Sequence, residues 1–78
     1  MKEGLLWFDA DPKRDLAEKV ARAADRYQFK FGRRPNLCQV NAAQWPQPVQ
    51  CDGVRVVPAH NVLRHHFWIG VEREEPAG

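Results

Sequence analysis

Hydrophobic positions along the chain follow two periods, and the longer one predicts a helix. From residue 12 to residue 31 apolar side chains recur at spacings of three and four, at Leu16, Val20, Ala23, Ala24, Tyr27 and Phe31. This spacing places one apolar stripe along a helix of about five turns. The opposite face of the same segment is charged, which indicates a helix that packs on a core with one side only.

Residues with known terminal preferences mark both ends of this helix. Asp11 precedes Pro12, and an aspartate before a proline at the first helical position is typical of a helix N-terminus. Gly32 can adopt the left-handed conformation that ends many helices. Asp9 and Asp11 also follow a hydrophobic segment, as metal-binding carboxylates do in several phosphate-handling enzymes. Since no further acidic cluster would complete such a site, we favour capping by Asp11 over catalysis.

The shorter period, which is alternation, predicts strands. Apolar segments between turn-forming residues predict strands at 4–9, 37–41 and 65–72. Residues 49–57 alternate on both sides of an Asp-Gly pair, the strongest local signature of a two-residue hairpin. The turn sets the register of this hairpin, with Cys51 opposite Val54, Gln50 opposite Arg55 and Val49 opposite Val56.

The resulting element order, β-α-β-β-β-β, predicts a single α+β domain over residues 1–78. Two strands joined by one helix form a βαβ unit, so the first two strands should run parallel with a right-handed crossover. One long helix should pack on one face of a small mixed sheet of four to five strands. Residues 1–3 and 74–78 are expected to be frayed tails.

One helix covers only one face of a sheet, so alternation divides the strand residues into two sets. The set expected beneath the helix is Leu6, Phe8, Cys38, Val40, Val49, Cys51, Val54, Val56, Phe67, Ile69 and Val71. The set expected on the other face is Leu5, Trp7, Leu37, Gln39, Gln50, Arg55, His66 and Trp68. The second set leaves large apolar side chains without a covering helix.

Large aromatic residues mixed with arginine and histidine on an open face indicate a contact surface. We therefore expect a small non-catalytic protein-interaction module, a homo-oligomer or a binder of another protein, which uses the open sheet face or an edge strand. The predicted contact residues are Trp7, Leu37, Arg55, His66 and Trp68. The alternative is that the loop around Trp45 folds over this face and covers it within the same chain.

Charge adds a second hypothesis, although the net charge of +2 at pH 7 does not by itself imply nucleic acid. Basic residues gather near the end of the helix and before the last strand, at Arg26, Lys30, Arg33, Arg34 and Arg64. Together with tryptophans as stacking platforms, they are compatible with a small single-stranded nucleic-acid-binding protein. The helix dipole alone also favours cations at a helix end, so we place this hypothesis second.

Enzymatic and metal chemistry find little support in the residue pattern. The candidate ligands Cys38, Cys51, His60, His65 and His66 lack the close cysteine pairs of structural zinc sites. No nucleophile has an activating neighbour at a recognisable spacing, and no Gly-rich phosphate loop is present. We expect no enzyme activity, no metal and no cofactor, and the pattern leaves open whether the two cysteines can form a disulfide.

The chain carries no recognisable membrane or export signal. No apolar run approaches the roughly 18 residues that span a bilayer, and the N-terminus lacks the apolar region of a signal peptide. Two cysteines are too few for the disulfide framework of a small secreted domain. A cytoplasmic location without a membrane partner is the expectation.

Overall fold

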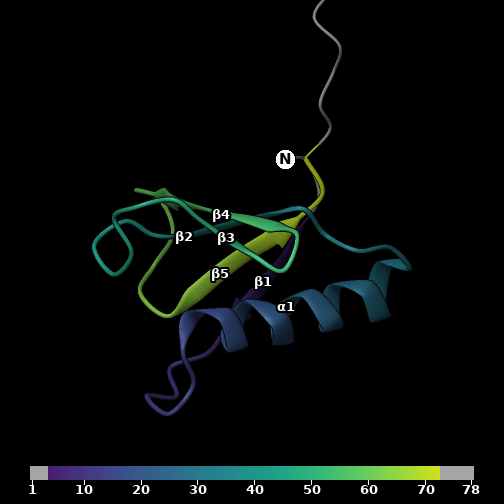
Figure 1. Cartoon of the computed structure of the whole chain (residues 1–78), viewed down its shortest axis with the longest axis horizontal. Helices are drawn as coiled ribbons and strands as arrows, with labels where there is room; N and C mark the ends of the chain where they lie inside the picture. Colours follow the sequence, from purple (N-terminus) through teal and green to yellow (C-terminus); the bar gives the residue numbers. More distant parts are fainter. Residues whose placement is uncertain (1–3, 73–78) are drawn as a thin grey trace, which may run out of the picture.

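The computed structural model describes residues 4–72, and the tails predicted at 1–3 and 74–78 lie outside this range. Its elements, in chain order, are β1 (Gly4–Phe8), α1 (Leu16–Phe31), β2 (Leu37–Asn41), β3 (Val49–Cys51), β4 (Val54–Ala59) and β5 (His66–Gly70). Figure 1 shows α1 lying along one face of the sheet. The prediction of an α+β fold, with one helix on one face of a small mixed sheet, is confirmed.

The sheet has five strands in the order β1-β5-β2-β4-β3. Strand β5 lies between β1 and β2 and runs antiparallel to both. The first two strands are therefore parallel, as predicted, but the last strand of the chain separates them. Strand β4 pairs parallel with β2 and antiparallel with β3, so β1 and β3 are the two edges of the sheet.

Helix α1 begins later than the sequence predicts. Its N-cap is Asp15, whose side chain accepts a hydrogen bond from the backbone N–H of Glu18 at 2.9 Å. The prediction that Asp11 caps the helix was wrong, because Pro12 lies in a turn in which the Asp11 carboxylate accepts from the N–H of Lys13 at 2.9 Å. At the other end Gly32 has φ 76° and its N–H donates to a helix carbonyl, which confirms the predicted terminus.

The predicted hairpin is present with the predicted register. Val49 pairs with Val56, Gln50 with Arg55 and Cys51 with Val54. Both turn residues, Asp52 and Gly53, have positive φ angles of 48° and 80°. This is the combination that a two-residue type I′ turn requires, so local chemistry alone specified this element.

The core lies between the sheet and α1, and it corrects the predicted division of β1 into faces. Leu5 and Trp7 pack against the buried core, whereas Leu6 and Phe8 are 58% and 60% exposed. The predicted positions of all four were therefore inverted. The neighbouring strand decides the face, since Trp7 pairs with the buried Phe67. Val49, also predicted to be core, is exposed on edge strand β3.

The loop between β2 and β3 packs on the helix side of the sheet. The Trp45 ring lies 5.5 Å from the ring of buried Phe67, and the Lys19 ammonium lies 6.0 Å from the Trp45 ring. Because Phe67 faces α1, Trp45 extends the core and does not cover the opposite face. The alternative that this loop covers the open face is therefore not what the structure shows.

Within residues 4–72 no helix combines the length and the apolar character needed to cross a membrane.

Candidate protein-interaction surface

The face of the sheet opposite α1, called here the helix-free face, carries exposed apolar side chains at its β1 end. Leu6 and Phe8 of β1 share this face with Trp68 and His66 of β5, because these residues are paired in register. Leu63, from the connector before β5, is 71% exposed beside them. We call Leu6, Phe8, Leu63, His66 and Trp68 the β1-side patch.

A hollow of about 270 Å³ opens within this patch. Its walls are Leu6, Gln39, Asn61, Val62, Leu63, His66 and Trp68. The volume lies just below the roughly 300–1,000 Å³ of typical small-molecule sites. Mixed apolar walls with a few polar groups at this size suit one or two side chains of a partner.

The connector at the rim of the hollow is held by polar contacts to the β2–β3 loop. The Asn41 side-chain N–H donates to the Val62 carbonyl at 2.8 Å. The Gln44 side-chain oxygen accepts from the backbone N–H of His65 at 2.6 Å, and the Gln44 amide nitrogen lies 3.2 Å from Nδ1 of His65. His65 itself has φ 64°, an uncommon conformation for a residue other than glycine. These contacts hold the rim of the hollow in place.

The His66 ring is held by the connector backbone and by Phe8. Its Nδ1 lies 2.9 Å from the carbonyl oxygen of Arg64. A carbonyl can only accept, so we assign the proton of the neutral ring to Nδ1, which leaves Nε2 as an acceptor. The ring centroid is 5.0 Å from that of Phe8, which keeps the imidazole against the exposed aromatic side chain.

Trp68 reaches across the sheet to β1 because Gly4 has no side chain. A Cβ added to Gly4 would lie 2.9 Å from Cε2 and Cζ2 of the Trp68 indole. The indole therefore lies against the first residue of β1. This places an aromatic ring beside an edge of the sheet, where a second chain can reach it.

Two of the predicted contact residues are not available at this surface. Trp7 lies on the helix side, and its indole N–H is buried without a hydrogen-bond partner among residues 4–72. Leu37 lies on the helix-free face, as predicted, because it alternates along β2 with the core residue Cys38. However, Leu37 is only 4% exposed. Arg55 is exposed and lies 2.6 Å from the Glu72 carboxylate, which neutralises it. His66 and Trp68 do line the surface.

None of the predicted basic residues lines this surface, although Arg64 is exposed in the connector between Leu63 and His65. Arg26 stacks at 5.4 Å from the ring of Phe29, and Lys30 lies 5.7 Å from the ring of Phe31, both on α1. Arg34 pairs with Asp25 at 3.2 Å, and Arg33 is exposed just after α1. These four residues lie on or just after α1, and α1 packs on the face of the sheet opposite the helix-free face (Figure 1).

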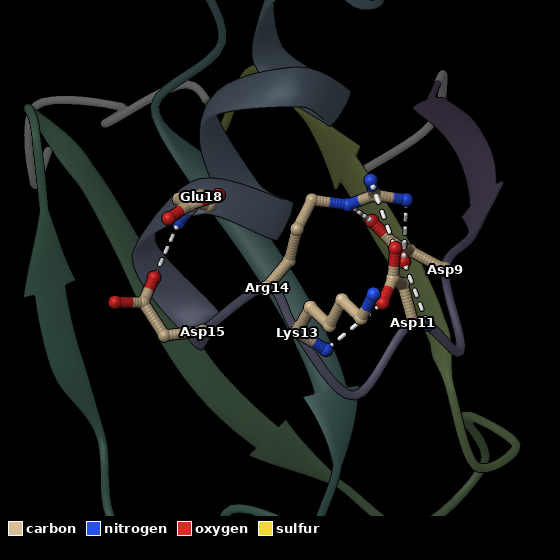
Figure 2. Close-up of polar contacts among 6 residues, drawn as sticks. All are labelled: Asp9, Asp11, Lys13, Arg14, Asp15 and Glu18. Atoms are coloured by element: carbon tan, nitrogen blue, oxygen red, sulfur yellow. Dashed lines mark hydrogen bonds and ion pairs between the residues drawn. The ribbon is translucent and has the colours of Figure 1, made fainter.

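The two aspartates after β1 form an ion-pair cluster with Arg14 (Figure 2). The Asp9 side chain is 2% exposed and contacts the Arg14 guanidinium at 2.9 and 3.2 Å. It also accepts from the N–H of Asp11 at 3.0 Å. The hydrogen bond from Arg14 lowers the pKa of Asp9, burial opposes this shift, and the bond from Asp11 adds to it. Both oxygens are engaged, so Asp9 ties the end of β1 to the turn before α1.

The cysteines are separated by strand β4. Cys38 lies in β2 and Cys51 in β3, two strand spacings apart, or roughly 10 Å. A disulfide needs Cα atoms about 4.4–6.8 Å apart, so the two cysteines, which the sequence left open as a possible pair, are too far apart to form one. Burial raises the pKa of the Cys38 thiol to about 12. Among residues 4–72 no group of three His, Cys, Asp or Glu side chains is placed to hold a metal ion.

Sequence reasoning missed Leu6, Phe8 and Leu63 as surface residues. The four consecutive apolar residues of β1 carry no alternation, and only the pairing with β5 reveals which of them are exposed. Leu63 lies in a connector without periodicity, so no sequence signal identifies it. Comparison with known proteins finds no matching family, no matching curated protein and no matching solved structure.

Proposed function

We propose that this protein is a small non-catalytic interaction module that self-associates through the β1 end of its helix-free face. The observation that carries the proposal is the exposure of Leu6, Phe8 and Leu63, each more than half exposed. Leu6 and Leu63 line the hollow, and Phe8 lies beside it against His66. Soluble monomers seldom leave such clusters of large apolar side chains in contact with water. Helix α1 lies on the other side of the sheet and cannot cover them (Figure 1).

The charge distribution supports a protein partner over a nucleic acid. Stacking of unpaired bases needs cations beside the aromatic platform to neutralise phosphates. Next to Trp68 the patch offers His66 and Arg64, whereas the other predicted basic residues lie near the end of α1. An unchanged tryptophan emission on adding a single-stranded oligonucleotide at low salt is therefore expected.

The magnitude of apolar burial sets how strong this association can be. Covering the remaining exposed surface of one such side chain is worth about 1–2 kcal/mol. Association costs about 4–15 kcal/mol in lost freedom of motion. Three side chains from each copy together contribute about 6–12 kcal/mol, a range that lies within this cost. Apolar burial alone therefore leaves little or no net stabilisation, and a stable dimer needs additional contacts at the same surface.

The test compares two phenylalanines on opposite sides of the molecule. Phe8 is 60% exposed on the helix-free face, and Phe29 is 81% exposed on α1. Sedimentation equilibrium should show a dimer for the unmodified chain and for Phe29→Glu. Phe8→Glu should be monomeric, because the interface would bury an unpaired carboxylate.

Two results would contradict the proposal. One is a monomer at high micromolar concentration for the unmodified chain. The other is a dimer that persists in Phe8→Glu and dissociates in Phe29→Glu, since that outcome would move the interface to the outer face of α1.

A further inference from the structure

Strand β1 has one unpaired side, and the hydrogen bonds at its end show which residues face outward. In an antiparallel ladder, alternate residues direct both N–H and C=O to the same neighbour. The N–H of Asp9 donates to the carbonyl of His65 at 2.9 Å, so Asp9 faces β5, and Trp7 and Leu5 do so by alternation. The N–H and C=O groups of Gly4, Leu6 and Phe8 therefore point away from β5, where no described strand pairs with them.

This edge lacks the features that normally prevent pairing with another chain. Natural edge strands are short, or carry charges, prolines or bulges. The opposite edge, β3, has three residues and lies between Pro48 and Asp52. Strand β1 has five residues, Gly-Leu-Leu-Trp-Phe, with neither charge nor proline. Of the two edge strands, β1 is therefore the better suited to pair with a strand of another chain.

We propose that two copies of the chain associate by antiparallel pairing of their β1 strands, with the Leu6 residues opposite each other on a two-fold axis. This inference rests on the proposed self-association and assigns its geometry. Gly4 of each copy then lies opposite Phe8 of the other, so every outward-facing residue of β1 meets an outward-facing partner. The interface is isologous, as closed dimers require.

The side chains of this register fit the surface already described. Residues directly opposite each other share a face of the sheet, so the two Leu6 side chains meet on the helix-free face. Phe8 of the second copy comes to lie opposite Gly4, where the Trp68 indole fills the space that the missing side chain leaves. The Phe8 ring therefore meets the indole, and the aromatic pair adds about 0.5–1.5 kcal/mol beyond its buried area. A shift of the register by two residues would lose this match.

Backbone pairing also supplies the stabilisation that apolar burial lacks. Each backbone hydrogen bond formed between the strands contributes about 0.5–1.5 kcal/mol net. The product is a continuous sheet across both copies, with both helices on the same side. Face-to-face stacking of two helix-free faces would leave the outward amides of β1 unpaired.

Amide hydrogen exchange measured by NMR on the full chain distinguishes these arrangements. At a concentration where sedimentation shows the dimer, the Leu6 and Phe8 amides should exchange at least roughly tenfold more slowly than in dilute protein. The Leu6 amide should show the same difference from Phe8→Glu. The Trp7 amide, which bonds within the monomer, is the matched control in the same strand and should be protected in every sample.

A dimer in which the Leu6 amide exchanges as fast as in the monomer would overturn β1 pairing and leave self-association intact. A chain that stays monomeric at every concentration would overturn both proposals. The two failures are thus distinguishable in one set of samples.

Discussion

At the scale of single residues, Asp9 is a buried acidic side chain with both carboxylate oxygens engaged. Its carboxylate is almost fully buried and bound by Arg14 and by a backbone N–H. A charge in such a position stabilises the fold only while its partner is present. The short Asp-x-Asp sequence, which suggests metal chemistry, here ends one strand and positions the turn that leads to α1 (Figure 2).

The first prediction concerns Asp9→Asn and its pH dependence. The folded-state pKa of Asp9 is lowered, chiefly by the hydrogen bond from Arg14, so its contribution is present above the unfolded pKa of about 3.9 and is lost as pH falls through the folded value. Urea unfolding at pH 7 should show a loss of about 1.5–3 kcal/mol. The difference from the unmodified chain should shrink at pH 3 and below.

Asp25→Asn is the matched control, because Asp25 also pairs with an arginine, at 3.2 Å, but its side chain is 78% exposed. Exposed pairs contribute about 0–1 kcal/mol, so this variant should change little at either pH. A loss at Asp9 that is the same at pH 7 and at low pH would show that the charge is not what stabilises the fold.

At the scale of elements, the second prediction tests where α1 begins. Asp15→Ala removes the side chain that accepts from the N–H of Glu18, and it should lower the free energy of unfolding by about 1 kcal/mol. Asp15→Asn keeps an acceptor and should restore most of this loss. Denaturant unfolding of both variants gives the comparison, and an alanine variant as stable as the unmodified chain would contradict capping by Asp15.

The elements also show which features the sequence could predict. The hairpin at Asp52 and Gly53 and the end of α1 at Gly32 depend on the conformations of one or two residues, and both were predicted correctly. The face of β1 was not, because Leu6 and Trp7 are equally apolar and only pairing with β5 separates them. The predicted start of α1 was wrong because the Asp11 carboxylate caps the turn through Pro12, and the N-cap of the helix lies four residues later, at Asp15.

At the scale of the whole molecule, the position of the last strand determines where the surface lies. Strand β5 inserts between β1 and β2, which makes β1 an edge and brings Trp68 beside it. Turn residues and alternation along a strand do not reveal the order of the strands in the sheet. The sequence could therefore predict that one face of the sheet is uncovered, but not which strand forms the edge of that face. The candidate surface was therefore only partly predicted, with His66 and Trp68 correctly placed and Leu6 and Phe8 assigned to the core.

The third prediction concerns the small hydrophobic core, which one helix and a five-stranded sheet form in a chain of 78 residues. A chain of this size has little stability in reserve, so association should contribute measurably to the folded state. If folding is coupled to dimerisation, the midpoint of thermal unfolding should rise by about 3–6 °C for each tenfold increase in protein concentration. Phe29→Glu should show the same rise in circular dichroism melts, whereas Phe8→Glu should melt lower and at a constant temperature. A midpoint of the unmodified chain that does not depend on concentration would mean that the second copy adds nothing to the fold, because mass action requires the dependence wherever the native state is a dimer.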